Sequence, residues 1–209
     1  MWNWSENQIN LVLLRHGATA SNKEHRYLGK TDEGLSIEGE KVLGEAAAKY
    51  PEADYIFSSP MKRCLETARI LYPNQDIITI DEWEEMDFGD FEGKNYKELQ
   101  GNELYQKWID SNGILPFPNG ESREEFIERC RRGFDNLLEK NLELPRKDKA
   151  LTLGLIVHGG IIMALLSIFY GGDYFDYQVA NGQGYICTGK EENGNFKITE
   201  IQKWGKDRV

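Results

Sequence analysis

Cysteine is scarce in this chain, which has 209 residues and only three cysteines, Cys64, Cys130 and Cys187. Their odd number and unrelated spacings exclude a disulfide framework and a metal site built on Cys-x-x-Cys pairs. A thiol phosphatase is excluded as well, because its Cys-x5-Arg loop is missing: only four residues separate Cys64 from Arg69. We therefore expect the three cysteines to be small core residues.

Basic residues are outnumbered, since 25 Lys and Arg against 35 Asp and Glu give a net charge of −10. Nucleic acids and anionic membranes need a basic face, so neither is expected as a partner. A small anionic substrate stays compatible with this charge, because local residues set the potential of a pocket. The opening residues, MWNWSENQ, contain no basic segment followed by an apolar one. We therefore expect no secretory signal and a cytoplasmic protein.

Long apolar runs are also missing, apart from residues 151–170, which approach the length of a membrane span. His158, Gly159 and Gly160 interrupt this stretch, and its first half, LTLGLIV, has a strand pattern. A strand, a glycine turn and a buried helix explain it better than a membrane span. With 40% hydrophobic residues and no linker or repeat, residues 1–209 are expected to form one domain.

Short apolar runs alternate with helical patterns along the chain. Strands are predicted at 9–14, 55–57, 77–80 and 153–157, and helices at 36–50, 59–72, 122–142 and 159–170. Ser59 before Pro60 predicts an N-cap with proline in the first helical position, and Ser122 with Glu125 fits a capping box. This alternation predicts an α/β fold with a mainly parallel sheet that is covered on both faces.

Two segments depart from the alternation. Residues 185–188 and 196–204, joined through 191–195, are predicted to form a closing hairpin. The segment 83–120 is predicted to be an excursion over the sheet edge. The aromatic residues of this segment are expected to form mostly a small core of its own. One or two of them are expected to line the mouth of a pocket that selects the alcohol part of a substrate. The aromatic residues are Trp83, Phe88, Phe91, Tyr96, Tyr105, Trp108 and Phe117.

Chemically active residues gather at the ends of the predicted strands. Arg15 and His16 follow the first strand and His158 follows the fourth, while Arg63 and Glu85 come soon after the second and third. The carboxyl ends of parallel strands meet at one edge of a sheet, where ligands bind in such folds. The third histidine of the chain, His25, lies between charged residues and is expected in an exposed loop.

These residue types suit phosphoryl transfer. Two guanidinium groups with imidazoles make a phosphate cradle. A neutral imidazole attacks phosphorus when its other nitrogen is held by a hydrogen bond, and a second imidazole stabilises the phosphoryl oxygens. A carboxylic acid protonates the leaving alkoxide and then deprotonates water. This scheme needs no metal and no cofactor.

The ordered segments RHGATASN, SSPMKRCLETA, EMDFGDFEG, FPNGES and VHGG make the chain resemble the histidine phosphatase superfamily, which has the phosphoglycerate mutase-like fold. The resemblance implies a three-layer αβα sandwich with a small helical cap, here the segment 83–120. It also implies a phosphohistidine at His16. Further site residues carried over from the family are Arg15, Arg63 and His158 for the phosphoryl group, Asn22 and the Gly159 amide as assistants, and Glu85 as acid and base.

Several alternatives stay open at this stage. Glu82 and Glu84 crowd Glu85 and compete with it for the acid/base role, while Asn22 could simply stabilise a turn. Thr19 either donates to phosphate or caps a local turn. The short cap and the HGG sequence resemble the phosphatase branch, which includes α-ribazole phosphatases, more than the mutases. The expected activity is hydrolysis of a small phosphorylated metabolite. A phosphomutase and a non-catalytic module that binds a phosphorylated ligand are the alternatives. The protein is expected to be a monomer or a homodimer.

Overall fold

The computed structural model describes residues 8–145, 150–192 and 195–205, and its centre is a six-stranded sheet. The strands lie in the order β3-β2-β4-β1-β5-β6. Their bounds are Ile9–Arg15 for β1, Tyr55–Ser58 for β2, Ile77–Thr79 for β3, Leu151–Val157 for β4, Gly184–Glu192 for β5 and Asn195–Trp204 for β6. The first four strands in this order are parallel to one another. β5 runs antiparallel to its neighbour β1, and β6 runs antiparallel to β5. The predicted mainly parallel sheet is confirmed.

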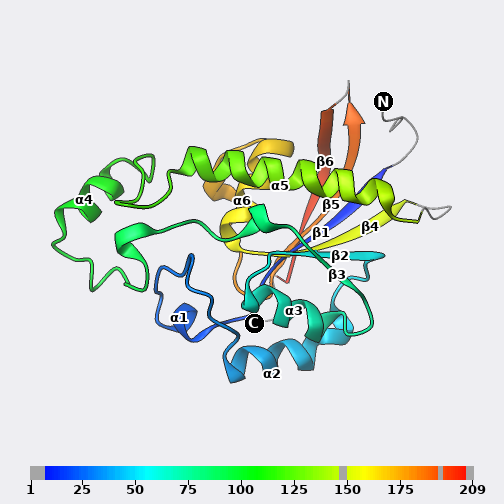
Figure 1. Ribbon diagram of the computed structural model, residues 1–209, viewed down its shortest axis with the longest axis horizontal. Helices are drawn as coiled ribbons and strands as arrows, with labels where there is room; N and C mark the ends of the chain where they lie inside the picture. The colour runs from blue at the N-terminus through cyan, green and yellow to red at the C-terminus, as the bar shows by residue number, and fades with distance from the viewer. Residues whose placement is uncertain (1–7, 146–149, 193–194, 206–209) are drawn as a thin grey trace.

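Both faces of the sheet are covered, because its central strands are apolar at successive positions. In β1, Leu11 and Leu13 belong to one buried cluster, whereas Val12 and Leu14 belong to the other. Successive side chains of a strand point to opposite faces, so a continuous apolar run needs a layer on each side. Figure 1 shows these layers, with α5 and α6 on one side of the sheet and α2 and α3 on the other. This is the three-layer α/β sandwich that the sequence predicted.

The helices are short except for α5. The α-helices are α1 (Ala20–Lys23), α2 (Ile37–Ala46), α3 (Lys62–Leu71), α4 (Glu103–Asp110), α5 (Arg123–Glu143) and α6 (Gly159–Phe169), and the 3₁₀ turns are η1 (Ala47–Lys49), η2 (Asp81–Trp83), η3 (Gly89–Phe91) and η4 (Tyr174–Tyr177). Ser36 accepts a hydrogen bond from the Gly39 amide at the start of α2. Ser122 and Glu125 form the predicted capping box at the start of α5.

The predicted start of α3 is wrong. The helix has Met61 as its N-cap and begins at Lys62, so Ser59 and Pro60 precede it. The Ser59 hydroxyl contacts the Nε2 atom of His158 at 2.9 Å and accepts a weaker bond from the Met61 amide. The Ser59 hydroxyl therefore has its partner in a side chain that lies 99 residues away in the sequence. A rule that considers only the residues around a helix start cannot predict such a contact.

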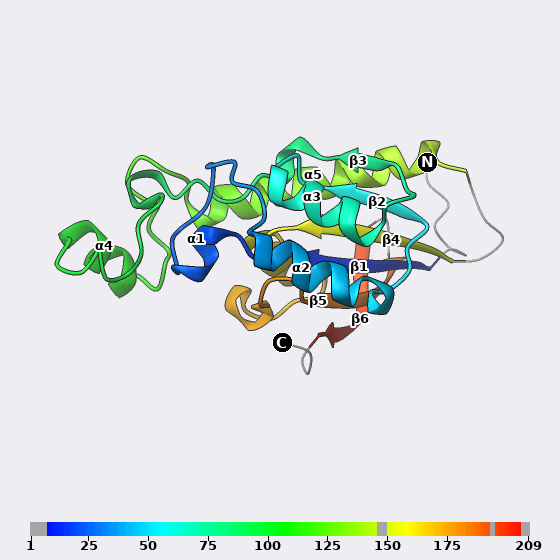
Figure 2. The ribbon, with the colours of Figure 1, turned by 90° about the horizontal axis from the view of Figure 1, so that it is seen from below.

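The segment 83–120 lies beyond the carboxyl ends of the parallel strands, at the end of the molecule where α1 is also found (Figure 2). Six aromatic rings pack there, and Tyr27 stands among them with contacts to five others, namely Phe88, Phe91, Tyr105, Trp108 and Phe117. Two predicted members lie elsewhere. Trp83 is fully buried, with its indole N–H donating to the Cys130 oxygen of α5, and Tyr96 is 56% exposed. The expectation of a separate small core is wrong, because Phe91 and Phe117 belong to the same buried cluster as the sheet.

The apolar stretch 151–170 forms the predicted strand, β4, and the predicted buried helix, α6. The expected glycine turn between them is wrong, because His158 alone connects the two elements as the N-cap, and Gly159 and Gly160 are the first residues of the helix. Within the described ranges, no helix has the length and apolar character needed to cross a membrane. The closing hairpin is formed by β5 and β6. Of the predicted connection 191–195, residues 193–194 lie outside the described residues.

Candidate active site

Strand register brings the two buried histidines together. β1 and β4 are parallel neighbours in which Arg15 lies opposite Val157. The next residues, His16 and His158, therefore leave the sheet at the same level. Their ring centroids are 5.2 Å apart and their planes form an angle of 67°. The pairing that the sequence predicted from strand ends is a direct result of this register.

His16 is held in one tautomer. Its Nδ1 atom lies 2.7 Å from the Gly17 carbonyl oxygen, which can only accept, so Nδ1 carries the proton. The Nε2 atom is then left without a proton. Burial, assisted by the positive charges of Arg15 and Arg63, lowers the pKa of His16 well below its usual value. The imidazole is consequently neutral at physiological pH, with a free electron pair on Nε2.

His158 is held in the opposite tautomer. The Nε group of Arg63 donates to its Nδ1 atom at 3.3 Å, so the proton of His158 lies on Nε2, beside the Ser59 hydroxyl. Burial, with Arg63 as the next cause, lowers the pKa of His158 well below its usual value. One imidazole therefore offers a lone pair and the other offers an N–H group.

Arg63 is fully buried, and the structure explains why. Its terminal nitrogens donate to main-chain oxygens of Gly29 at 2.9 Å and Thr31 at 2.9 Å. Its Nε group is used by His158. In this arrangement Arg63 fixes the loop 28–31 against the second histidine, and its charge acts on both imidazoles.

Arg15 differs from Arg63 because part of its guanidinium has no protein partner. Its Nη1 group donates to the Val179 oxygen at 2.8 Å. Its Nε atom is buried and makes no hydrogen bond. Gly159 lies against this atom, since a Cβ at that position would be 3.5 Å from it. A buried N–H group without a partner is costly, so a ligand that accepts from Arg15 at this point is favoured.

Glu85, rather than Glu82 or Glu84, reaches this group. Its Oε1 atom accepts from the Met86 amide at 3.0 Å, and a Cβ added to Gly160 would be 2.5 Å from it. Burial raises the pKa of the Glu85 carboxyl, although the nearby arginines act in the opposite direction. Glu84 is exposed, and Glu82 accepts a hydrogen bond from Asn136. The acid/base alternatives are thereby separated by position.

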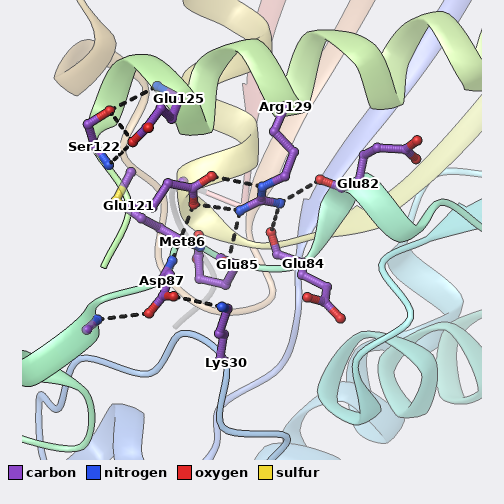
Figure 3. A network of polar contacts seen from close by, with 12 residues as sticks. Lys30, Glu82, Glu84, Glu85, Met86, Asp87, Glu121, Ser122, Glu125 and Arg129 are labelled. Atoms are coloured by element: carbon purple, nitrogen blue, oxygen red, sulfur yellow. Dashed lines mark hydrogen bonds and ion pairs between the residues drawn. The ribbon is translucent and has the colours of Figure 1, made fainter. Parts of the chain in front are cut away.

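Arg129 of α5 holds the backbone that carries Glu85 (Figure 3). It donates to the main-chain oxygens of Glu82, Glu84 and Glu85 at 2.7, 2.9 and 3.3 Å. It also makes a two-pronged contact with the Glu121 carboxylate, at 2.9 and 2.7 Å. An arginine fork that binds three carbonyls within four residues and a carboxylate leaves this stretch little freedom.

Thr19 and Asn22 form a local capping box. The Thr19 hydroxyl accepts from the Asn22 amide, and the Asn22 Oδ1 atom accepts from the Thr19 amide. Asn181, which the sequence did not single out, donates to Asn22 Oδ1 at 2.9 Å and to the oxygens of His16 and Gly17 at 3.2 Å. No sequence pattern marks Asn181, because its partners lie about 160 residues away.

A cavity of about 280 Å³ opens beside these groups. Arg15 and Gly159, the sequence neighbours of the two histidines, form part of its wall together with Glu85. The other walls are mostly aromatic and come from Tyr27, Phe88, Trp108, Phe117, Tyr174 and Phe175. Its polar end holds the Arg15 guanidinium and the Glu85 carboxyl group. The two neutral imidazoles are buried next to Arg15 and Gly159 in the chain, and groups of these kinds can together transfer a phosphoryl group. Across the described residues, no cluster of three or more His, Cys, Asp and Glu suits a metal ion.

Comparison with known proteins gives a consistent assignment. Residues 11–201 match the family described as the histidine phosphatase superfamily (branch 1). The Bacillus subtilis protein named uncharacterized phosphatase PhoE is 34% identical over 167 residues, which make up 78% of each chain. Three mycobacterial relatives are 35% identical over 137 residues, but this chain spans only 37% of their length.

Solved structures resemble the fold closely. A putative α-ribazole-5′-P phosphatase from Escherichia coli has a TM-score of 0.77 at 21% identity, with 94% of this chain and 97% of that chain covered. A mutant phosphoserine phosphatase from Entamoeba histolytica, in complex with phosphoserine, has a TM-score of 0.74 at 25% identity, with 92% and 96% covered.

Proposed function

The chain belongs to the histidine phosphatase superfamily, and from that membership and the site geometry we infer that it hydrolyses phosphomonoesters through a phosphohistidine at His16. The observation that carries this proposal is the Nδ1 contact of His16 with the Gly17 oxygen, which leaves Nε2 free. A neutral, oriented imidazole beside an arginine with an unpaired N–H group is the arrangement that attack on a phosphoryl group requires.

The reaction proceeds in two steps. His16 Nε2 attacks phosphorus and the bond from phosphorus to the alkoxide oxygen breaks, while Glu85 in its protonated form donates a proton to that oxygen. The ionised Glu85 then takes a proton from water, whose oxygen attacks phosphorus and releases Nε2. Arg15 stabilises the charge on the phosphoryl oxygens, and the His158 ring assists from beside His16. Arg63 orients His158, and Asn22 and the Gly159 amide support the phosphoryl group from the sides.

The substrate we propose is a small phosphorylated metabolite, and the segment 83–120 acts as the cap that selects it. The small volume of the cavity, about 280 Å³, supports a small alcohol part. α-Ribazole 5′-phosphate is one candidate, and the resemblance of the fold to the Escherichia coli protein supports including it. A phosphomutase of the phosphoglycerate type is the second candidate, supported by a Parvibaculum lavamentivorans relative of that name with 33% identity.

The test is the release of inorganic phosphate in the presence of EDTA. The panel contains α-ribazole 5′-phosphate, sugar phosphates, phosphoglycerates, phosphoserine and nucleotides. The wild type is expected to hydrolyse at least one member and to carry an acid-labile, alkali-stable phosphoryl group during turnover. Interconversion of phosphoglycerates without phosphate release would instead establish the mutase.

The variant His16→Ala is expected to lose turnover and the bound phosphoryl group while it retains the fold by circular dichroism. His25→Ala serves as the matched control, because His25 is exposed in a turn with φ of 54°. Its activity should stay within about 2-fold of the wild type, as for a surface change. Turnover that persists in His16→Ala would refute the phosphohistidine scheme.

A further inference from the structure

The arginines of α5 differ in how their charges are balanced. Arg129 pairs with Glu121, and both Arg131 and Arg132 lie near Glu128. Arg123, at the start of the same helix, forms no ion pair with any of the described residues.

Aromatic rings hold Arg123 in place. Its Cζ atom is 5.9 Å from the centroid of the Tyr174 ring and 5.7 Å from that of Phe175. Such contacts stabilise a guanidinium without using the N–H groups in its plane. Tyr174 is itself anchored, because its hydroxyl approaches the Gly160 oxygen at 3.4 Å. Arg123 is therefore positioned against the active site by a chain of contacts and keeps its donors available.

Arg123, Arg15 and Glu85 are the charged residues among those that line the aromatic cavity. Burial raises the pKa of Glu85 and so favours its neutral form. The cavity consequently has an excess of positive charge. Arg15, beside His16, serves the phosphoryl group in the proposed function, and Arg63 lies outside the cavity lining. The positive charge of Arg123 is left for a second anionic group of the same ligand.

We propose that the substrate is a phosphomonoester whose alcohol part combines an apolar body, about the size of one ring, with a carboxylate that Arg123 binds. This proposal rests on the proposed function and names the substrate class of that site. The aromatic walls favour the flat apolar body. The planar guanidinium suits a carboxylate, which it can bind through two N–H groups.

The test compares two substrates of nearly equal shape, para-carboxyphenyl phosphate and para-carbamoylphenyl phosphate, together with their meta isomers. The first carries the anion and the second is its neutral isostere. For the wild type, the ratio of kcat/KM between the anionic and the neutral substrate should exceed unity for at least one pair of isomers. In Arg123→Gln this ratio should fall about 10- to 100-fold, the loss typical of a charge-assisted hydrogen bond.

Arg132→Gln is the matched control, because Arg132 lies on the same helix with a side chain that is 57% exposed. Its substrate ratio should equal that of the wild type. Arg123→Lys keeps the charge and should retain part of the preference. A fall in both rates that leaves the ratio unchanged in Arg123→Gln would assign Arg123 a purely structural role and overturn the proposal.

Binding separates this proposal from the proposed function. Calorimetry with the inert His16→Ala variant measures the affinity for the same substrates without turnover. Tighter binding of a carboxyphenyl phosphate than of its carbamoyl isostere, reduced by Arg123→Gln, supports the carboxylate site even if the wild type hydrolyses neither. Equal affinities would overturn the carboxylate site, whatever the wild type does in the phosphatase assay.

Discussion

At the scale of single residues, chemically identical side chains differ in their surroundings. His16 and His158 are buried with lowered pKa values, whereas His25 is exposed. Glu85 lines the cavity, while its neighbour Glu84 is exposed and points its main-chain oxygen at Arg129. Environment, rather than residue type, therefore selects the groups suited to acid and base chemistry.

The acid/base assignment leads to a prediction about leaving groups. Glu85→Gln should lower kcat/KM for an alkyl phosphate by about 100- to 10,000-fold, because the alkoxide then leaves without a proton. The loss should be much smaller for para-nitrophenyl phosphate, whose phenolate leaves unprotonated. Steady-state kinetics with both substrates measure the difference.

Glu84→Gln and Glu82→Gln are the controls for this prediction. Both residues lie within three positions of Glu85, yet neither lines the aromatic cavity. Each variant should keep kcat/KM within about 3-fold of the wild type, as expected for groups that do not take part in proton transfer. A larger effect of Glu84→Gln than of Glu85→Gln would move the assignment to Glu84.

At the scale of elements, α5 connects the core to the site. Its capping box sets where the helix begins and so places Arg123 at the cavity. Two turns further on, Arg129 binds three carbonyls of the stretch 82–85 and the Glu121 carboxylate. Farther still, Phe134 packs on Phe169 of α6 and on Phe196 of β6. The helix α5 therefore connects the packed core to residues 82–85, which include the proposed acid/base residue Glu85.

The variant Arg129→Met tests this connection. It leaves the Glu121 carboxylate, which is 15% exposed, without its partner, and it removes three donors to main-chain oxygens. We expect a loss of about 2–3 kcal/mol in the free energy of unfolding, measured with urea. Arg132→Met should cost less than about 0.5 kcal/mol, because its ion pair is exposed and long. Equal losses in the two variants would contradict a special role for Arg129.

At the scale of the whole molecule, the two layers of helices enclose the sheet and bury the histidines at its carboxyl edge. Because burial lowers the pKa values of His16 and His158, the unfolded chain binds protons below about pH 6.5 that the folded chain does not bind. Stability is therefore lost as the pH falls below that value. Glu85, whose pKa is raised, has the opposite effect, because the folded chain binds a proton on this carboxyl group at a higher pH than the unfolded chain does.

This proton balance can be measured by urea unfolding at about pH 7.5 and pH 5.5. Each buried histidine should contribute a loss of roughly 1 kcal/mol over this range. His16→Gln should reduce the pH dependence by about that amount. A His16→Gln variant with the same pH dependence as the wild type would contradict a neutral, buried His16 in the folded chain.

The sequence by itself determined the strands, the starts of α2, α5 and α6, and the set of strand-end residues at the site. These features depend on neighbouring residues: the apolar run 9–14 selects a doubly buried strand, and Ser122 with Glu125 selects a helix start. The convergence of Arg15, His16 and His158 followed from the rule that parallel strands end at one edge of a sheet.

Only the tertiary structure decided which of the clustered candidates reach the site. Glu85 was separated from Glu84 by its approach to Gly160, and Ser59 left its predicted capping role for His158. Asn181 and Arg123 act on partners about 160 and 50 residues away in the chain. Contacts of this kind depend on how whole elements pack against one another. Local sequence patterns therefore do not predict them.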